Sequence, residues 1–507
     1  MTSSRAIACV SLCGMLTFSL AVRAQTVKPE TAAPQPGQPQ KPPIVAGPRA
    51  VAKVYAEFCA SCHGPTLDGG QAPTLLDDTW SFGSDDASLA QTIRDGRPPT
   101  PMPSFKAALS EQEIRALVIF IREEHAKARV TRATAKPPAP IGGMVVESQL
   151  ETFKLEIVAE GLDTPWGIDW LPDGSMLVSE RGGTVRHIAK DGTLSAPIAG
   201  VPPVWVKQDG GLMDIAVHPK FGTDGNNWIY LAFSEPGKIA ESSTTRIIRA
   251  RLEKGPDSAY KLADHQTLFQ APPELYWIDN THFGARFIFD KDGHLFYSIG
   301  DRGHEKDAQD LGSPYGKLHR IHDDGRVPDD NPFVKTPGAI PTIWSYGHRN
   351  QQGLAFHPVT GVLYASEHGP RGGDELNVIV PGKNYGWPAI TYGMNYDGTP
   401  ITDRTEQAGM EQPLVQWTPS IAVCALEFYT GDRLPRWKHE LFVTALAFRE
   451  LRRLTLKDGQ VVSQEVLFKN IGRVRDVATG PDGLLYVALN EPGRIVRLVP
   501  ASASRNQ

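Results

Sequence analysis

The sequence predicts a multidomain protein in which a small all-α domain is followed by an all-β six-bladed propeller. A chain of 507 residues is too long for one ordinary core, and two Pro-rich stretches divide it. Regular repetition in the C-terminal part favours a radial propeller over the alternative, a long β-sandwich. There, a turn with Asp, Asn or Gly precedes a short apolar strand at residues 176–178, 229–231, 295–297, 362–364 and 484–487, and a weaker copy lies at residues 440–443.

The first 24 residues have the pattern of an export signal. Arg5 is positively charged, residues 6–22 are apolar, and Val22-Arg23-Ala24 is a small-x-small cleavage site. An uncleaved membrane anchor is the alternative, but the apolar run is slightly short for a span, and no other segment is apolar enough. We therefore expect a periplasmic protein with no transmembrane segment after cleavage. Residues 25–48 are expected to form a Pro-rich linker.

Charge and cysteine content restrict the partners and the chemistry. The net charge of −5, without a long basic run, argues against nucleic acid as a partner. Of the five cysteines, Cys9 and Cys13 would leave with the signal, and Cys59 and Cys62 belong to one motif. No pair therefore remains for a structural disulfide. Cys424 lies alone in an apolar stretch, so we expect it to be buried.

Residues 49–129 are expected to form the small helical domain, followed by a Pro/Ala linker over residues 130–149. The last helix of this domain gives the clearest signal, because Ser110 and Glu113 form a capping box. Four apolar residues then fall on one helix face, namely Ile114, Leu117, Val118 and Ile121.

The small domain contains a motif for covalent haem attachment, Cys59-Ala60-Ser61-Cys62-His63. In haem c, both thiols bond to the haem and the adjacent histidine ligates the iron. A thioether is a suitable second axial ligand, and Met102, between two prolines, is the best candidate. A redox dithiol or half of a zinc site are the alternatives, but the immediate His63 and the export signal favour haem c.

The same residues carry a resemblance to class I cytochromes c, which extends over about eighty residues. It comprises a first helix, the haem motif at residues 59–63, the Met102 loop and a C-terminal helix. The resemblance implies a cytochrome c domain that accepts and passes on single electrons.

In the propeller, residues 150–500, polar phrases interrupt the apolar strands at or near their ends, where the loops converge on the central channel. Convergent arginines indicate an anion with several carboxylates or phosphates, and a nearby histidine is a candidate general base. Gly-Pro carbonyls near acids suit a hard cation such as calcium. The phrases are residues 281–284, 300–303, 347–350, 367–375, 384–388 and 472–476.

Three stretches that include polar phrases make the propeller resemble the soluble aldose sugar dehydrogenases that use pyrroloquinoline quinone (PQQ), the glucose/sorbosone dehydrogenase family. The matching stretches are residues 345–356, 367–375 and 384–388, and the resemblance covers nearly all of residues 150–500.

The resemblance implies a role for each matching residue. His282 is the catalytic base that deprotonates the anomeric hydroxyl of the sugar, and Asp301 orients it. A calcium ion is bound by the carbonyls of Gly369 and Pro370. A second calcium site involves Glu375 and the Tyr385 carbonyl. The implied contacts to the quinone or its neighbourhood are Gln208, Asp209, Arg349, Asn350, Trp417, Arg473 and Arg475.

Two departures from the family pattern affect the quinone contacts. The family has Gln before Gly-Gly-Leu, whereas this chain has Asp209 there and Gln208 one residue earlier. The family often has a cofactor-binding Lys in the strand before the arginine pair, whereas residues 444–449 contain only Arg449 as a cation.

Together these patterns predict a periplasmic dehydrogenase that oxidises an aldose at C1 to its lactone with PQQ and calcium. Electrons would pass to the fused haem c and then to an external acceptor, such as a periplasmic cytochrome or the respiratory chain. Three alternatives remain open: a haem-carrying propeller that only binds a ligand, a calcium-dependent lactonase or hydrolase, and a dehydrogenase for another alcohol or aldehyde.

Overall fold

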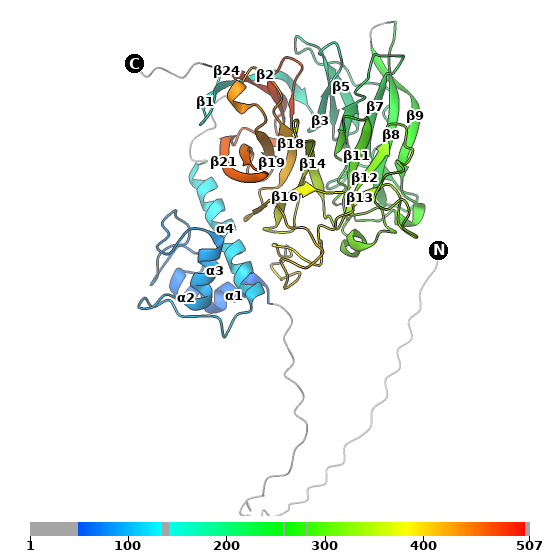
Figure 1. Cartoon of the computed structure of the whole chain (residues 1–507). Coiled ribbons are helices and arrows are strands. Elements are labelled where there is room, and N and C mark those ends of the chain that lie inside the picture. Colours follow the sequence, from blue (N-terminus) through cyan, green and yellow to red (C-terminus); the bar gives the residue numbers. More distant parts are fainter. Residues whose placement is uncertain (1–48, 134–140, 257–258, 280, 502–507) are drawn as a thin grey trace, which may run out of the picture. The chain divides into compact units, whose positions relative to one another are not determined.

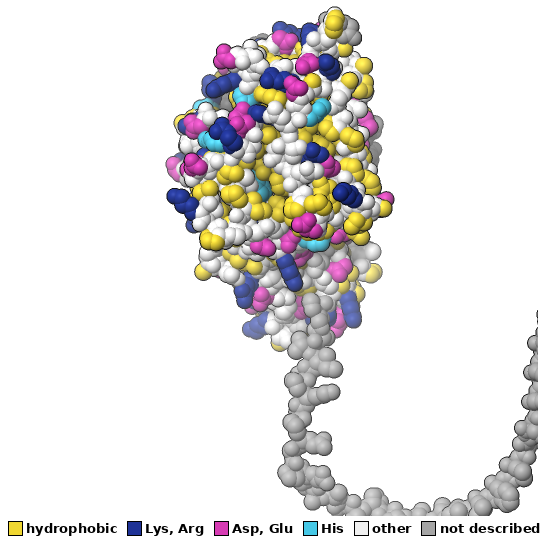
Figure 2. Space-filling view, turned by 90° about the vertical axis from the view of Figure 1, so that its right-hand side faces the viewer, with side chains coloured by type: hydrophobic (Ala, Val, Ile, Leu, Met, Phe, Trp, Pro, Cys, Tyr) yellow, Lys and Arg dark blue, Asp and Glu magenta, His cyan; other side chains and the backbone are white. Residues whose placement is uncertain are grey.

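The computed structural model describes residues 49–133, 141–256, 259–279 and 281–501 (Figure 1). The predicted signal and first linker, and residues 134–140 of the second linker, lie outside these ranges. Among the described residues, no helix is both long and apolar enough to cross a membrane. On the face drawn in Figure 2, Lys and Arg side chains alternate with Asp and Glu, so no broad area of one charge is present on that face.

The N-terminal domain is all-α, as predicted. The predicted capping box at its last helix is confirmed: Ser110 N donates to Glu113 Oε2 over 3.0 Å, and Glu113 N donates to Ser110 Oγ over 3.3 Å. The four apolar residues predicted to share one face of this helix are all buried. The helices are α1 (Val51–Phe58), α2 (Ala60–His63), α3 (Asp86–Asp95) and α4 (Glu111–Ala133).

The C-terminal part contains six antiparallel sheets among the described residues, which confirms the six-bladed propeller. Each sheet is one blade, and its first strand lies innermost. The first three blades are β3 (Pro165–Trp170), β4 (Met176–Glu180) and β5 (Thr184–Ile188); β6 (Leu212–Val217), β7 (Trp228–Pro236), β8 (Ser243–Lys254) and β9 (Tyr260–Gln270); and β10 (Phe287–Phe289), β11 (His294–Ile299), β12 (Lys317–His322) and β13 (Ile343–Tyr346).

The ring is closed by the N-terminal strands of the propeller, because β2 (Thr152–Leu162) pairs with the last strand, β24 (Gly493–Pro500). The remaining blades are β14 (Gln351–Phe356), β15 (Leu363–Glu367), β16 (Asp374–Ile379) and β17 (Val415–Trp417); β18 (Val423–Phe428), β19 (Leu441–Ala445), β20 (Glu450–Lys457) and β21 (Gln460–Lys469); and β22 (Arg473–Thr479), β23 (Leu485–Asn490), β24 (Gly493–Pro500), β2 (Thr152–Leu162) and β1 (Val145–Glu147).

The six sequence repeats correspond to the second strand of each blade: β4, β7, β11, β15, β19 and β23. A polar turn begins each of these strands, and the strand itself is buried between neighbouring blades. Six apolar clusters fill the spaces between successive blades. One of them joins Leu162 and Val178 to Tyr486, so it connects the first blade to the last and completes the circle.

Candidate active site

In the N-terminal domain, the haem motif lies at the junction of α1 and α2. His63 Nδ1 lies 3.0 Å from the carbonyl oxygen of Pro73. A carbonyl can only accept, so Nδ1 carries the proton and Nε2 is left as the metal-binding nitrogen. Phe58 and Phe105 lie edge to face, with ring centroids 6.0 Å apart, and pack with Cys59 in the domain core. This apolar, histidine-bearing wall suits a haem.

The Cys59 thiol argues against the redox-dithiol alternative. Burial, with a contribution from Cys62, raises the pKa of Cys59 to about 11. The attacking thiol of a redox dithiol has a lowered pKa instead. Met102 lies in a loop that is fixed by a backbone hydrogen bond: Arg97 N donates to the Met102 carbonyl over 3.1 Å. Its role as the second iron ligand remains a prediction.

In the propeller, His282 and Asp301 form a hydrogen-bonded pair. His282 Nδ1 lies 2.6 Å from Asp301 Oδ1, and the Asp301 side chain has no exposed surface. Gly303 N donates to the same oxygen over 2.9 Å, and Trp387 Nε1 donates to Oδ2 over 2.7 Å. Burial opposes ionisation of Asp301, but the hydrogen bond and charge of His282 and the charge of Arg349 outweigh it and lower its pKa.

This pairing determines what His282 can do. An ionised Asp301 accepts the Nδ1 proton, so Nε2 is the nitrogen with a free lone pair. The His282 side chain is 17% exposed, which leaves it accessible to a substrate. Arg302, buried beneath the loop, donates to the carbonyl of Asp279 over 2.6 Å and also to that of Thr281. The arrangement is therefore that of an oriented general base.

Arg349 and Asn350, just before β14, lie next to this pair. Asp301 N donates to the carbonyl of Arg349 over 2.7 Å. Arg349 Nη1 donates to the Gly369 carbonyl over 2.7 Å, whereas its Nε has no partner among the described residues. Asn350 Oδ1 accepts from Gly284 N over 3.0 Å, which ties the Asn350 side chain to the loop that carries His282.

Arg473 and Arg475 lie on β22, the innermost strand of the last blade. Burial lowers the pKa of Arg473, and the neighbouring charge of Arg475 lowers it further. Arg475 Nη1 donates to Gln352 Oε1 over 3.2 Å, but the buried Nε of Arg475 has no partner among the described residues. Two close cations with spare donors are stabilised by an anion.

His368 adds a third unsatisfied nitrogen to this region. Burial, followed by the charges of Arg475 and Arg349, lowers its pKa to about 3, and its buried Nε2 has no partner within the described ranges. A buried polar group without a hydrogen-bond partner lowers the free energy of unfolding, so such groups indicate the place of a ligand or water. The spare N–H donors of Arg349 and Arg475 therefore fit a flat anion with several acceptors, such as PQQ, with the neutral imidazole of His368 beside them.

The Gly369–Pro370 loop offers the two predicted calcium carbonyls. Gly369 O accepts one hydrogen bond from Arg349, and Pro370 O accepts from Gly373 N over 2.9 Å and Ser420 Oγ over 3.1 Å. Gly369 O retains a lone pair, because a carbonyl oxygen has two. The loop is also fixed by Asp374 Oδ1, which accepts from Gly369 N over 3.2 Å. Pro370 O already accepts two hydrogen bonds, so in this arrangement only Gly369 O has a lone pair free for a hard cation, and the calcium site remains a prediction.

The second predicted calcium site has one distinctive feature. Glu375 lies opposite Glu367 in the β15–β16 pairing. Burial and the Glu367 charge raise the pKa of Glu375 to about 8. The described residues contain no group of three or more acidic, His or Cys side chains that could hold a metal ion. The Tyr385 ring stacks on His348 with centroids 4.5 Å apart. The site remains a prediction.

Three other predicted contacts to the quinone or its neighbourhood are Asp209, Gln208 and Trp417. Asp209 is exposed, and its Oδ2 accepts from His282 N over 3.3 Å. Gln208 is exposed as well, and its carbonyl accepts from Arg181. Trp417, on β17, is buried in an apolar cluster and donates to Gln464 Oε1 over 3.0 Å, and its place at the substrate mouth remains a prediction. Cys424 is buried, as predicted, 3.4 Å from Arg475 Nη1.

Three residues of the site were not identified from the sequence: Trp387, His368 and Gln352. All three lie within phrases that the sequence singles out, residues 345–356, 367–375 and 384–388. The phrases indicated the region, but which side chains point inward depends on contacts between blades.

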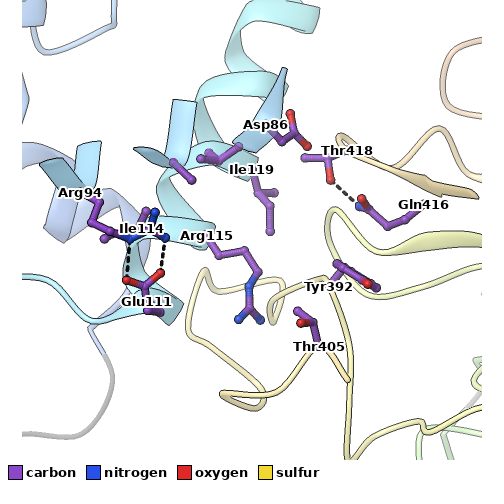
Figure 3. A pocket seen from close by; sticks show the side chains of 12 residues that line it. Asp86, Arg94, Glu111, Ile114, Arg115, Ile119, Tyr392, Thr405, Gln416 and Thr418 are labelled. Carbon is purple, nitrogen blue, oxygen red and sulfur yellow. Dashed lines mark hydrogen bonds and ion pairs between the residues drawn. The ribbon is translucent and has the colours of Figure 1, made fainter. Parts of the chain in front are cut away.

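A separate pocket of about 280 Å³ is drawn in Figure 3. It contains the Arg94–Glu111 ion pair and the hydrogen bond between Gln416 and Thr418. None of the predicted site residues lines this pocket, so it is distinct from the candidate active site.

Comparisons with known proteins match both parts of the chain. Residues 162–497 match the family model of glucose/sorbosone dehydrogenase, and residues 46–121 match that of cytochrome c oxidase, cbb3-type, subunit III. Aldose sugar dehydrogenase YliI of Escherichia coli (strain K12) is 41% identical over 354 residues, which is 69% of this chain and 93% of that protein.

Two further relatives cover different parts. The PQQ-bound aldose sugar dehydrogenase of Streptomyces coelicolor is 29% identical, with a TM-score of 0.57, over 71% of this chain and 99% of that one. The cbb3-type cytochrome c oxidase subunit FixP of Bradyrhizobium sp. (strain ORS 278) is 39% identical over 73 residues, 14% of this chain and 25% of that protein. The chain therefore belongs to the glucose/sorbosone dehydrogenase family, with a cytochrome c domain preceding its propeller.

Proposed function

We propose that this protein is a periplasmic quinohaemoprotein that oxidises an aldose sugar at C1 to its lactone. It would use PQQ and calcium in the propeller and haem c in the N-terminal domain. The observation that carries the proposal is the His282–Asp301 pair, 2.6 Å apart, beside arginines whose buried Nε atoms lack partners among the described residues. An accessible base next to an unsatisfied anion site supports a quinone-dependent oxidation.

The residues would act as follows on a bound sugar. His282 Nε2 takes the proton of the C1 hydroxyl while Asp301 stabilises the imidazolium that forms. The C1–H bond breaks with its electron pair, and the C1–O bond becomes the lactone carbonyl. When bound, the quinone accepts that hydride, and the haem supplies single-electron transfer to an external acceptor.

The remaining residues would bind and orient. Arg349, Arg473 and Arg475 would hold carboxylates and oxygens of the cofactor, and the Gly369 carbonyl, with Pro370 as the second predicted ligand, would hold calcium. Arg349 also stabilises negative charge that develops during the reaction. Arg449 adds to the positive field, since its charge contributes to the lowered pKa of Arg473. This supports Arg449 as a partial substitute for the lysine that the family often has in the preceding strand.

Dye-linked aldose oxidation by the purified haem-containing protein tests the proposal, before and after addition of PQQ and calcium. We expect activity only when both are present. PQQ binding should require the divalent cation, because the Gly369 and Pro370 carbonyls are neutral. Equal PQQ affinity with and without a chelator would remove the calcium assignment. No aldose oxidation with both cofactors would remove the aldose dehydrogenase proposal and leave the ligand-binding alternative or oxidation of another alcohol or aldehyde.

A further inference from the structure

Trp387 connects the two halves of the candidate site. Its Nε1 donates to Asp301 Oδ2 over 2.7 Å, and its ring lies beneath Arg349, with the guanidinium carbon 5.4 Å from the ring centroid. A cation within about 6 Å of an indole face is attracted by it. One buried side chain thus contacts both the residue that orients His282 and a residue proposed to hold the quinone.

The backbone around Trp387 fixes the direction of the indole. Trp387 N donates to the Gly347 carbonyl over 2.9 Å, and Gln309 Nε2 donates to the Trp387 carbonyl over 2.7 Å. Gly347 follows β13, and Gln309 ends the short helix Glu305–Gln309 that comes soon after Asp301. The segment that carries Trp387 is therefore attached to the blade that carries Asp301, although Trp387 itself belongs to the next blade along the chain.

The Trp387 hydrogen bond is the principal support for one oxygen of Asp301. Oδ1 accepts from His282 and Gly303, whereas Oδ2 accepts only from Trp387 among the described residues. The Asp301 side chain has no exposed surface, so no bulk water replaces a lost donor. A hydrogen bond to a buried charged group contributes more than one between neutral groups.

We infer that Trp387 is a positioning residue that sets the proton affinity of the Asp301–His282 pair. The inference rests on the proposed function, in which His282 is the base. Without the indole N–H, the Asp301 carboxylate would bind a proton more tightly and would hold the His282 Nδ1 proton more strongly. Both effects raise the pH at which the pair becomes protonated, and a protonated base cannot accept the sugar proton. The other titratable and charged groups that face the pair stay the same in a Trp387 variant; they are Asp209, Arg302, Glu305, Arg349 and His368.

Trp387→Phe tests this, because it removes the N–H but keeps an aromatic face beneath Arg349. In the holoprotein, the acid limb of the pH profile for quinone reduction should move up by roughly one pH unit. KM for the sugar and PQQ affinity should stay near wild type. Trp437→Phe is the matched control: Trp437 is fully buried, and its Nε1 has no partner in the described part of the chain. It should leave the acid limb in place.

Two further variants separate positioning from general destabilisation. Trp387→His places an imidazole Nε2 where the indole Nε1 was, so it should return the acid limb toward wild type. In an Asp301→Asn background, Trp387→Phe should cause little additional loss of rate, because the two residues act through one hydrogen bond. An unshifted acid limb in Trp387→Phe, or losses that multiply in the double variant, would overturn the inference.

A measurement on the protein without PQQ distinguishes this inference from the proposed function. NMR titration of the His282 imidazole in the haem-containing, PQQ-free protein should give a higher pKa in Trp387→Phe than in wild type. An unchanged His282 titration would overturn the inference even if the enzyme is active. A shifted titration in a protein that oxidises no aldose would leave the coupling intact and would refute the proposed function.

Discussion

His282 is the residue on which the proposed chemistry depends most. His282→Ala should reduce the rate of quinone reduction by about a hundred- to ten-thousand-fold, the usual contribution of a positioned base. PQQ affinity should change little, because arginines and calcium are proposed to hold the cofactor. Stopped-flow absorbance with an aldose measures the rate. A wild-type rate in this variant would mean that the catalytic base lies elsewhere.

Arg475 should show the opposite pattern. Its side chain faces Gln352 and Cys424 and has a spare buried donor, so it is suited to holding an anion. Arg475→Ala should weaken PQQ binding, with a smaller effect on turnover at saturating PQQ. Calorimetric titration and turnover measurements separate the two effects. Unchanged PQQ affinity would exclude Arg475 from the quinone site.

At the scale of residues, the sequence predicts which segments form the candidate site, but it does not predict the side-chain contacts between those segments. The hydrogen bond from Trp387 to Asp301 joins residues 86 positions apart, and the one from Arg475 to Gln352 joins residues 123 positions apart. Such contacts depend on how neighbouring blades meet, which local patterns do not contain. Trp417 is a second example: its position in the sequence did not indicate that it packs into an apolar cluster.

At the scale of elements, buried carboxylates link the innermost strands of neighbouring blades. Asp169 of β3 accepts from Val217 N of β6 over 2.7 Å, and Asp214 of β6 accepts from Phe287 N of β10 over 2.7 Å. The repeats predicted six blades because turn chemistry and apolar strands are local signals. These carboxylate links could not be predicted, since each pairs a side chain with the backbone of another blade.

These links predict a pH dependence of stability. Burial raises the pKa of Asp169 from 3.8 to about 6. Because the folded-state pKa is raised, the protonated Asp169 contributes fully to the free energy of unfolding below pH 3.8. This contribution is lost as the pH rises toward 6. Asp169→Asn removes the titration, so wild type should lose roughly 2 kcal/mol relative to the variant between pH 4 and pH 7. Denaturant unfolding at both pH values measures this, and a pH-independent difference would contradict it.

At the scale of the whole molecule, the N-terminal domain should make the protein a covalent haem protein. Cys62→Ala should abolish or weaken covalent haem retention on a denaturing gel, because one of the two thioether bonds cannot form.

Met102→Ala should keep the haem attached but lower its potential and alter its ligand-state spectrum. An unchanged spectrum and potential would exclude Met102 as an iron ligand.

The fusion of the two domains contributes to the proposed function only if electrons pass from the propeller to the haem domain of the same chain. A tethered acceptor has a high effective concentration, so transfer should not depend on encounters between molecules. Intermolecular transfer, in contrast, would accelerate in proportion to protein concentration.

Anaerobic stopped-flow mixing of an aldose with the protein containing haem, PQQ and calcium tests this central claim most directly. The predicted result is rapid quinone reduction followed by haem reduction, at a rate that is unchanged when the protein concentration is varied tenfold. Quinone reduction without haem reduction, or a haem rate proportional to protein concentration, would contradict the account.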